Sequence, residues 1–525
     1  MMSHRRDQIT FSDISPWFKK PILPESSFYV KFSKWSLVNI KDEMFTSMYS
    51  QSGVGRPSIP PSLMAGVLLL MLHDSVTDRE AEEKAKFDLR WKVALDLPMD
   101  QAGFDFTTLC KFRTGLIVNE KNSVIFDSII EMAIEAGILP KDIEQVVDST
   151  SVIGAGAVQN TYTLIQRAMR KLIKTAKRHP RVRSTVAAFS RDYLQKDKPD
   201  INWDSKEDRK KLLKELVTDA NALLGAMGEN DLNKWEQEAR EILSKVTWQD
   251  IEINEQQEPQ IRQGVAKDRI ISISDPEMRH GHKTSKGLFN GYKDSILEDP
   301  NTELITGVAV AEGNKHDAEV INELLCCAER AGINTTQLTG DTAYGAAETR
   351  MALKGEKINV IAPVANSSNK GLFSKSQFTI NFDQESCRCP NDYVTKLCTR
   401  DRETKAIKSF NFPEEACQSC PLRPQCTNGK KGRSISVHPH EVVLQEAREY
   451  QKTEQFKDKY RLRPKIERKI AELKHHGLGK SSYRGKAKVQ FQLTWTAAMV
   501  NIKKLFRLAE ANDYLSKMLG LSAPI

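Results

Sequence analysis

Three carboxylates in this chain stand in settings suited to chemistry on a phosphodiester. Asp148 follows the apolar run 143–147, Asp341 follows Leu338-Thr339-Gly340, and Glu467 lies in a basic stretch that continues to Lys474. Carboxylates are hard oxygen ligands of the kind that Mg²⁺ takes together with substrate phosphate. Three of them in one place can hold two ions about 3.5–4 Å apart, which suits in-line displacement at phosphorus. The residue types therefore predict a two-metal site for phosphodiester chemistry.

Two blocks of basic residues indicate which class of phosphodiester the protein would bind. The chain carries a net charge of +9 and has a pI near 8.9. Residues 457–488 hold twelve Lys or Arg against three acids, and residues 167–183 hold eight bases and no acid. Concentrated positive charge of this kind is the electrostatic footprint of a protein that binds a polyanion. We therefore expect a nucleic acid as the partner.

Length and composition restrict the class of protein. A chain of 525 residues is too long for one hydrophobic core and predicts roughly three or four domains. The most apolar stretch, 63–72, is too short to span a bilayer, and the opening residues lack the apolar segment of a secretory signal. Nine cysteines in a chain of this size do not suggest a disulfide framework. These features predict a soluble cytoplasmic protein without a membrane partner.

The order of expected elements predicts an α/β core that is interrupted twice. Helices are expected at 63–73, 79–95, from 107 through 113, at 123–136, over much of 160–262, at 317–331 and over 441–515 with a loop at 477–485. Strands are expected to end at Asp148 and to cover 269–273, 303–311, 337–339 and 357–363. Strands alternating with helices are typical of an α/β fold. The first helices fit a helix-turn-helix DNA binder with Lys111 and Arg113 on its last helix, or else a plain helical packing domain.

The third carboxylate lies on an expected helix together with two bases. At about 100° per residue, Arg463, Glu467 and Lys474 fall within an arc of about 40°. Pro464 suits the first position of that helix. One acid between two bases on one face can place the carboxylate on a metal and the bases on phosphates. An amphipathic helix held by i,i+4 ion pairs would give the same pattern.

The spacing Tyr460-x2-Arg463-x3-Glu467-x6-Lys474 resembles the YREK signature of DDE transposases from bacterial insertion sequences. The segments 146–150 and 339–345 resemble the settings of that superfamily's first and second catalytic aspartates. Further similar segments are Asp275-Pro276-Glu277 with Gly291-Tyr292, residues 313–317, and the N-terminal helical region 56–117. The resemblance covers most of the chain and is weakest over 160–262.

This resemblance implies a ribonuclease H-like catalytic core. Asp148, Asp341 and Glu467 would be the catalytic residues and would bind two Mg²⁺ ions, for which Mn²⁺ can substitute. One ion would activate water or a DNA 3′-hydroxyl, and the other would stabilise the leaving oxygen. Arg463 and Lys474 would hold phosphates near the cut. Tyr460 would contact DNA or pack against the helix.

The resemblance also divides the chain into six parts. They are an N-terminal helical DNA-binding domain at 1–117, core segments at 118–159 and 263–364, a helical insertion at 160–262, a Cys-rich insertion at 365–440, and a C-terminal part of the core with the YREK helix at 441–525.

The implied activity is that of a transposase, an endonuclease and recombination enzyme. It would bind the ends of a mobile element in double-stranded DNA, cleave them and join them to target DNA. It would work as a homodimer or higher multimer in the bacterial cytoplasm, associated with the nucleoid when bound. Two alternatives stay open. One is a DDE-type nuclease without strand transfer, and the other is a non-catalytic DNA-binding protein that retains the fold.

Six of the nine cysteines fall within 387–426. Cys417-x2-Cys420 with Cys426 and the upstream Cys389 has the character of a Cys₄ zinc site, and a structural zinc ion would explain how so polar a segment folds. Cys387, His438 or His440 can replace one ligand. Free thiols and a redox role are the other interpretations.

Some relatives cut through a DNA hairpin and hold a flipped base with a Trp in the insertion before the Glu. No Trp lies between Trp248 and Trp495. The aromatic residues that can substitute are Phe373, Phe378, Tyr393, Phe410 and Phe412, so the hairpin route stays open.

Overall fold

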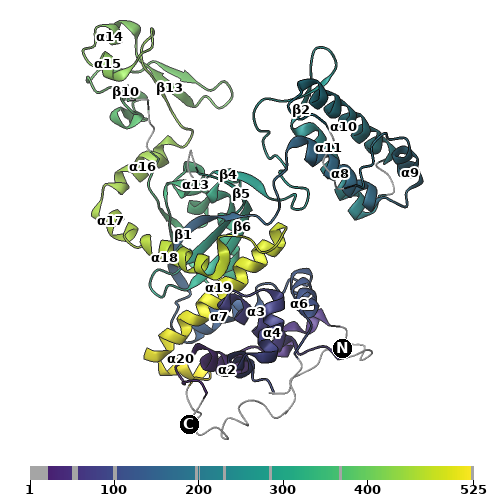
Figure 1. Ribbon diagram of the computed structural model, residues 1–525. Helices are drawn as coiled ribbons and strands as arrows, with labels where there is room; N and C mark the ends of the chain where they lie inside the picture. The colour runs from purple at the N-terminus through teal and green to yellow at the C-terminus, as the bar shows by residue number, and fades with distance from the viewer. Residues whose placement is uncertain are drawn as a thin grey trace.

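The computed structural model describes most of the chain. The described residues are 22–49, 57–98, 103–195, 199, 201–228, 232–282, 287–365, 369 and 371–521. The opening residues, on which the prediction of no secretory signal depends, lie outside these ranges. Within them the protein has a mixed α/β fold, with one central sheet, helices packed on it and two lobes that project from it (Figure 1).

The central sheet has six strands. They are β1 (Asp142–Ile153), β4 (Arg279–His282), β5 (Leu288–Glu298), β6 (Ile305–Glu312), β7 (Asn334–Thr339) and β8 (Asn359–Ile361). The order is β4-β5-β1-β7-β8, and β6 also pairs with β5. β5 is antiparallel to β1, β4 and β6, whereas β1, β7 and β8 run parallel. The sheet is therefore antiparallel on one side of β1 and parallel on the other.

Three expectations about strands were wrong. β1 does not end at Asp148 but continues to Ile153, because Ser149, Thr150 and Ser151 pair with β5. β5, the neighbour of β1, was missed altogether. The stretch 269–273 is not a strand, because the side chains of Gln249 and Gln159 take the hydrogen bonds that a neighbouring strand would supply.

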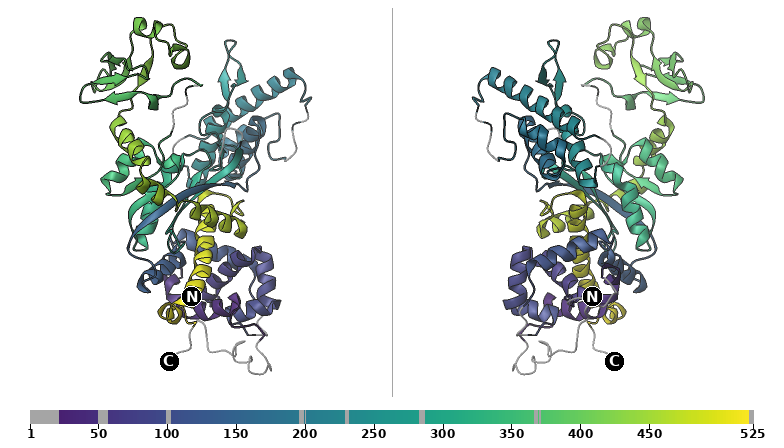
Figure 2. Two further views of the ribbon diagram at one scale, coloured as in Figure 1. Left: turned by 90° about the vertical axis from the view of Figure 1, so that its left-hand side faces the viewer. Right: turned by 90° about the vertical axis from the view of Figure 1, so that its right-hand side faces the viewer.

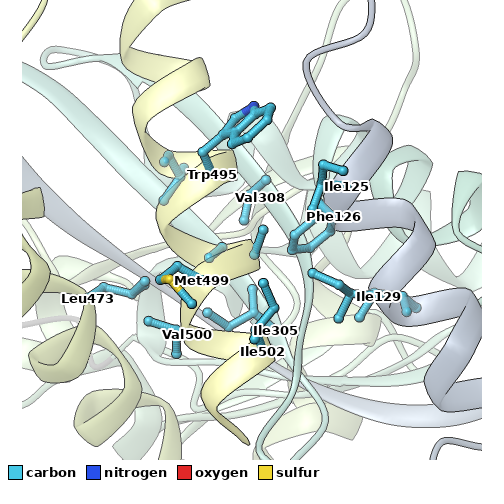
Figure 3. Close-up of a cluster of buried hydrophobic side chains, with 14 of the residues drawn as sticks. Ile125, Phe126, Ile129, Ile305, Val308, Leu473, Trp495, Met499, Val500 and Ile502 are labelled. Carbon is cyan, nitrogen blue, oxygen red and sulfur yellow. The ribbon is translucent and has the colours of Figure 1, made fainter. Parts of the chain in front are cut away.

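Helices cover both faces of the sheet. α12 (Ile321–Arg330) packs on one face, where a Cβ on Gly307 would lie 2.7 Å from the carbonyl oxygen of Leu324. On the other face lie α18 (Pro464–Leu473) and the 23-residue α19 (Lys486–Leu508). Figure 3 shows Trp495 and Met499 of α19 packed beside Val308 of β6. The buried amide of Asn501 bonds both the N–H and the C=O of Ile305, which ties α19 to β6.

The N-terminal helices share their hydrophobic core with the sheet. They are α2 (Phe28–Asn39), α3 (Pro61–Asp74), α4 (Asp78–Phe87), α5 (Leu89–Leu95), α6 (Phe106–Val118) and α7 (Val124–Glu135). Figure 1 shows them below the sheet, with α19 running among them. The helix expected at 79–95 is divided, because Asp88 caps α5 through the N–H of Arg90. These helices are thus joined to the sheet by packing and not only by the chain.

Two lobes have hydrophobic cores of their own. The helical lobe holds α8 (Thr161–Thr175), α9 (Pro180–Ala187), α10 (Lys206–Ala226), α11 (Lys234–Gln249), β2 (Ile251–Ile253) and β3 (Pro259–Ile261). The Cys-rich lobe holds β9 (Thr379–Asn381), β10 (Ser386–Arg388), β11 (Val394–Thr395), β12 (Cys398–Arg400), β13 (Ile407–Asn411), α14 (Glu414–Gln418), α15 (Arg423–Cys426) and β14 (Ser434–Ser436). Figure 2 shows the lobes apart from each other, on the side of the sheet away from the N-terminal helices.

Shorter elements complete the chain. They are α13 (Ala347–Gly355) after β7, α16 (Glu441–Gln451) and α17 (Glu454–Tyr460) before α18, a π-helical turn at Lys474–Leu478, and α20 (Asp513–Met518). No helix in the described parts of the chain is long and apolar enough to cross a membrane.

Candidate active site

The first two carboxylates lie at the same edge of two neighbouring strands. The parallel pairing of β1 with β7 ends where Val146 faces Thr339. Asp148 and Asp341 each follow two residues later. Because parallel strands end at the same edge of a sheet, the pairing register brings these two side chains together, at the edge where α/β folds bind ligands.

The third carboxylate is presented by α18. Ile466, Ile470 and Leu473 recur at helical spacing and are buried, and Glu467 lies about 90° around the helix from the middle of this stripe. Pro464 occupies the first helical position, as expected. Glu467 therefore points away from the buried stripe, and its side chain is 55% exposed.

The three carboxylates line one open cavity of about 450 Å³. The lining residues are Asp148, Ser149, Thr150, Ser151, His282, Phe289, Lys293, Asp317, Asp341, Arg463, Glu467, Ile470, Ala471 and Lys474. The structure thus brings together residues that are 319 positions apart in the chain, from Asp148 to Glu467. Five of the six residues selected from the sequence for catalysis and phosphate contact are among them.

Arg463 links two of the carboxylates. Its Nη1 donates to Oε1 of Glu467 at 2.5 Å, and its Nη2 donates to Oδ2 of Asp148 at 3.3 Å. Asp148 also accepts a hydrogen bond from the N–H of Ser149 at 2.8 Å. Burial nevertheless raises the pKa of Asp148 to about 6, and the nearby Asp341 and Glu467 add to this effect. Burial by itself would lower the pKa of Arg463, but the surrounding carboxylates raise it.

Asp341 is held by a short helical turn. It caps the 3₁₀ turn Thr342–Tyr344 and accepts a hydrogen bond from the N–H of Ala343 at 2.8 Å. Tyr344 in this turn is buried under the strand ends. The sequence Gly340-Asp341-Thr342-Ala343-Tyr344 therefore fixes the backbone of the second carboxylate.

The cavity contains a charged pair that the sequence did not indicate as part of the site. Nζ of Lys293, on β5, lies 2.6 Å from Oδ1 of Asp317. The 3₁₀ turn that starts at Asp317 is capped by His316, whose ring nitrogen accepts from the N–H of Ala318. Asp317 belongs to the segment 313–317, and the resemblance of this segment to the family was the sequence signal that could have indicated its place in the site.

Lys474 and Tyr460, the two remaining residues predicted to contact DNA, differ in position. Lys474 follows α18, where the π-helical turn begins, and lines the cavity. Tyr460 does not line it. Its ring stacks on Phe456, with the centroids 5.4 Å apart and the planes at 14°, and burial raises its pKa. Of the two roles left open for Tyr460, this placement favours packing.

The four predicted zinc ligands lie together in the Cys-rich lobe. Cys389, Cys417, Cys420 and Cys426 line one cavity of about 280 Å³. The pKa of Cys426 is raised by burial and, in addition, by the proximity of the three other thiols. The backbone N–H of Arg433 donates to Sγ of Cys417 at 3.5 Å. Such N–H···S contacts orient a thiolate and raise its suitability as a ligand.

The alternative ligands lie elsewhere. Cys387 is fully buried in β10, and burial raises its pKa to about 12. His438 lies 3.1 Å from Glu348, and the N–H of His440 bonds to His438. Of the aromatic residues that could hold a base, Phe373, Phe378, Tyr393 and Phe412 line the same cavity as the four thiols, while Phe410 is buried in the lobe's core.

Within the described residues, no group of three or more His, Cys, Asp or Glu side chains is arranged so that it could hold a metal ion as it stands. In the candidate active site the carboxylate of Glu467 is bonded to Arg463.

Arg113, expected as a DNA contact of the N-terminal helices, faces inward. It is 6% exposed and forms an ion pair with Asp78 at 2.6 Å. Its guanidinium also stacks over Tyr483, 4.7 Å from the ring centroid. Tyr483 lies in the loop between α18 and α19, so this arginine joins the N-terminal helices to the segment that follows the catalytic helix.

Two separate segments of the chain match families of known proteins. Residues 388–506 match the family described as "Transposase DDE domain", and residues 20–115 match the family described as "Transposase domain (DUF772)". The first segment contains Arg463, Glu467 and Lys474, and the second contains the N-terminal helices up to α6. No curated protein and no solved structure matches the chain. The two matches, in this order along one chain, support a DDE transposase of the insertion-sequence type.

Proposed function

We propose that this transposase cleaves the ends of a mobile DNA element and joins them to target DNA, with Asp148, Asp341 and Glu467 as the catalytic carboxylates. The observation that carries the proposal is their convergence on one cavity. Asp148 lies in β1 just beyond its parallel pairing with β7, Asp341 follows β7, and Glu467 lies on α18. Arg463 and Lys474 line the same cavity. Such a group, open to solvent and flanked by bases, suits a phosphodiester better than a small neutral substrate.

The proposed core is ribonuclease H-like. In support, the sheet is ordered β4-β5-β1-β7-β8 with β6 also paired to β5, β5 is antiparallel to its three partners, and β1, β7 and β8 run parallel. The proposed division of the chain keeps 160–262 and 365–440 as insertions. Each contains a hydrophobic core separate from that of the sheet.

DDE transposase domains generally use divalent metal ions, and we infer Mg²⁺, with Mn²⁺ able to substitute. Asp148, Asp341 and Glu467 would hold two ions, because their donor atoms are the hard oxygens that Mg²⁺ prefers. Bound there, the metal would supply activation of water or of a 3′-hydroxyl and stabilisation of the leaving oxygen.

The chain's own residues would orient the DNA. The planar guanidinium of Arg463 suits bidentate contact with a phosphate, and Lys474 acts as a point charge. Arg463 can bind a phosphate only after it releases Glu467 and Asp148, so DNA binding would free the carboxylates. The pKa of Asp148 is about 6. Its carboxyl group must therefore lose a proton before it can act as a metal ligand. Tyr460 would fix the start of α18 by its stacking on Phe456.

In the Cys-rich lobe, Cys389, Cys417, Cys420 and Cys426 would hold a structural zinc ion. The lobe has a small core of six buried residues, so a metal would contribute much of its folding energy. The protein would act in the bacterial cytoplasm as a homodimer or higher multimer on DNA.

The test is cleavage of DNA that carries the element's own ends, with Mg²⁺ and with EDTA, by wild type, Glu467→Gln and Asp458→Asn. Asp458 is an exposed acid on α17 and serves as the matched control. Metal-dependent cuts at the ends that vanish only in Glu467→Gln, followed by joined products, are expected. Cuts without joining would indicate a nuclease without strand transfer. Tight binding without cutting by any of the three proteins would refute catalysis.

A further inference from the structure

The helical lobe leaves one group of cations without acidic partners. Arg167 and Lys174 lie on α8, Lys177 and Arg178 follow it, and Arg181 and Arg183 lie on α9. All six are exposed. Among the described residues, none of the six side chains forms an ion pair or a hydrogen bond. We call these six residues the α8–α9 basic surface.

Several other cations of the same lobe form ion pairs or hydrogen bonds. Lys210 and Lys214 pair with Glu258, Lys245 pairs with Asp268, and Arg262 pairs with Glu252. On α8 itself Lys171 pairs with Glu238, at 2.7 Å. Arg170 donates to the carbonyl oxygen of Tyr193 at 2.8 Å. These cations are neutralised or used within the lobe, whereas the six residues of the α8–α9 basic surface are not. Lys206 and Lys211 on α10, Lys234 on α11 and Lys267 after β3 also form no ion pair among the described residues, but no other stretch of the lobe holds six unpaired cations within 17 residues.

Clustering like charges costs free energy, which a bound polyanion would offset. A cation that is already paired must give up its acid before it contacts a phosphate, whereas an unpaired one does not. The positions suit a surface contact, because Arg167 and Lys174 are seven residues apart and share a helix face. Figure 1 places α9 on the side of the lobe away from the sheet, in that view.

We propose that the α8–α9 basic surface is a second DNA-contact site, separate from the catalytic cavity, which binds backbone phosphates of duplex DNA without reading sequence. This inference rests on the proposed function, because it assumes that duplex DNA lies at Asp148. Arg167 follows Asp148 by 19 residues, which limits their separation to about 65 Å. Arg167, the first residue of the surface, would therefore contact DNA within about 19 base pairs of the cut.

The chemistry predicts a characteristic salt dependence. Each phosphate that a cation neutralises contributes about 0.9 to the slope of log K against log salt. The four-site variant Arg167→Gln/Lys174→Gln/Arg178→Gln/Arg181→Gln should therefore reduce this slope by up to about 3.6. Its affinity for a duplex of about 40 base pairs should fall at least about tenfold at low salt. The loss should be the same for the element end and for an unrelated duplex, because phosphates carry no sequence information.

The matched control removes four charges from the same lobe. It is Lys210→Gln/Lys214→Gln/Lys245→Gln/Arg262→Gln, whose cations are exposed but already paired. Both variants have the same net charge, so a general charge effect would change both slopes equally. Unfolding curves of both would establish that the lobe is intact.

Binding would be measured in the Glu467→Gln background as well, so that the surface is tested without catalysis. A reduced slope for the four-site variant in this background would support the second DNA-contact site even if no cleavage were ever seen. Normal cleavage by wild type, together with an unchanged slope for the four-site variant, would refute the second DNA-contact site and leave the proposed function intact. Equal slopes for the four-site variant and its control would overturn the proposal. A loss confined to the element end would also overturn it, because the surface would then read bases.

Discussion

Arg463 and Glu467 form an ion pair on the wall of the candidate active site. Nη1 of the arginine lies 2.5 Å from Oε1 of the glutamate, one helical turn away. The same guanidinium reaches Asp148. A single cation therefore contacts two of the three carboxylates and reduces the repulsion between them.

This contact predicts that Arg463→Gln binds divalent metal more tightly than wild type in the absence of DNA. Removal of a cation from the two ligands should raise the affinity for Mn²⁺ at least about tenfold, because charges about 5 Å apart interact by roughly 3 kcal/mol near a protein surface. Free Mn²⁺ measured by electron paramagnetic resonance would report this without any catalysis. The control is Arg461→Gln, which removes an exposed cation paired with Asp458. Equal affinities in wild type and Arg463→Gln would contradict the prediction.

The Cys-rich lobe should contain zinc. We expect about one zinc ion per chain in protein purified without chelator, measured by elemental analysis. Cys417→Ser should lose the metal and destabilise the lobe, whereas Cys398→Ser should retain it, because Cys398 lies in β12 and does not line the thiol cavity. Wild-type protein that is free of metal, with all nine thiols open to titration, would contradict a zinc site.

Glu298 should make the stability of the protein depend on pH. It is fully buried on β5, and both of its carboxylate oxygens lack a hydrogen-bond partner within the described residues. Burial raises its pKa to about 7, although the nearby Lys469 opposes the shift. Between pH 4.5 and 7 the native state keeps a proton that the unfolded state has lost. The free energy of unfolding therefore falls as the pH rises through this window, by up to about 3 kcal/mol.

Urea unfolding at pH 5 and pH 7.5 would measure this change. Glu298→Gln keeps the shape of the side chain but cannot ionise, so its stability should vary less over the same range. Glu329→Gln, at an exposed position, should behave like wild type. A Glu298→Gln variant with the full pH dependence of wild type would show that another group is responsible.

Arg113 should matter for stability and not for DNA contact. Its substitution by Ala would leave Asp78 unpaired next to buried surface and would remove the stacking on Tyr483. We expect a loss of about 3–5 kcal/mol, as for other broken buried ion pairs. Lys111→Ala, on the same helix but exposed, should leave stability unchanged. If Arg113→Ala instead lowered the salt slope of DNA binding with normal stability, the buried placement would be wrong.

Local sequence features were sufficient for the helix that carries Glu467. Pro464 starts it, Ile466, Ile470 and Leu473 form its buried stripe, and the i,i+4 spacing sets Arg463 beside Glu467. These are interactions between near neighbours in the chain, so periodicity predicts them. The same holds for α3 and α7. The choice of Asp148 and Asp341 as partners depended on resemblance, because neither residue has a local pattern that distinguishes it from an ordinary turn or cap.

Tertiary structure decided the rest, for reasons that no local pattern contains. β5 was missed because Lys293, Asp294, Ser295 and Glu298 make it polar, yet β1 and β6 bury it from both sides. Arg113 is buried because Asp78 and Tyr483 meet it there from elsewhere in the chain. The register of β1 on β7 is what places Asp148 beside Asp341. The sequence by itself thus determined which residue types are available and where helices begin, whereas long-range pairing determined which of them share the cavity.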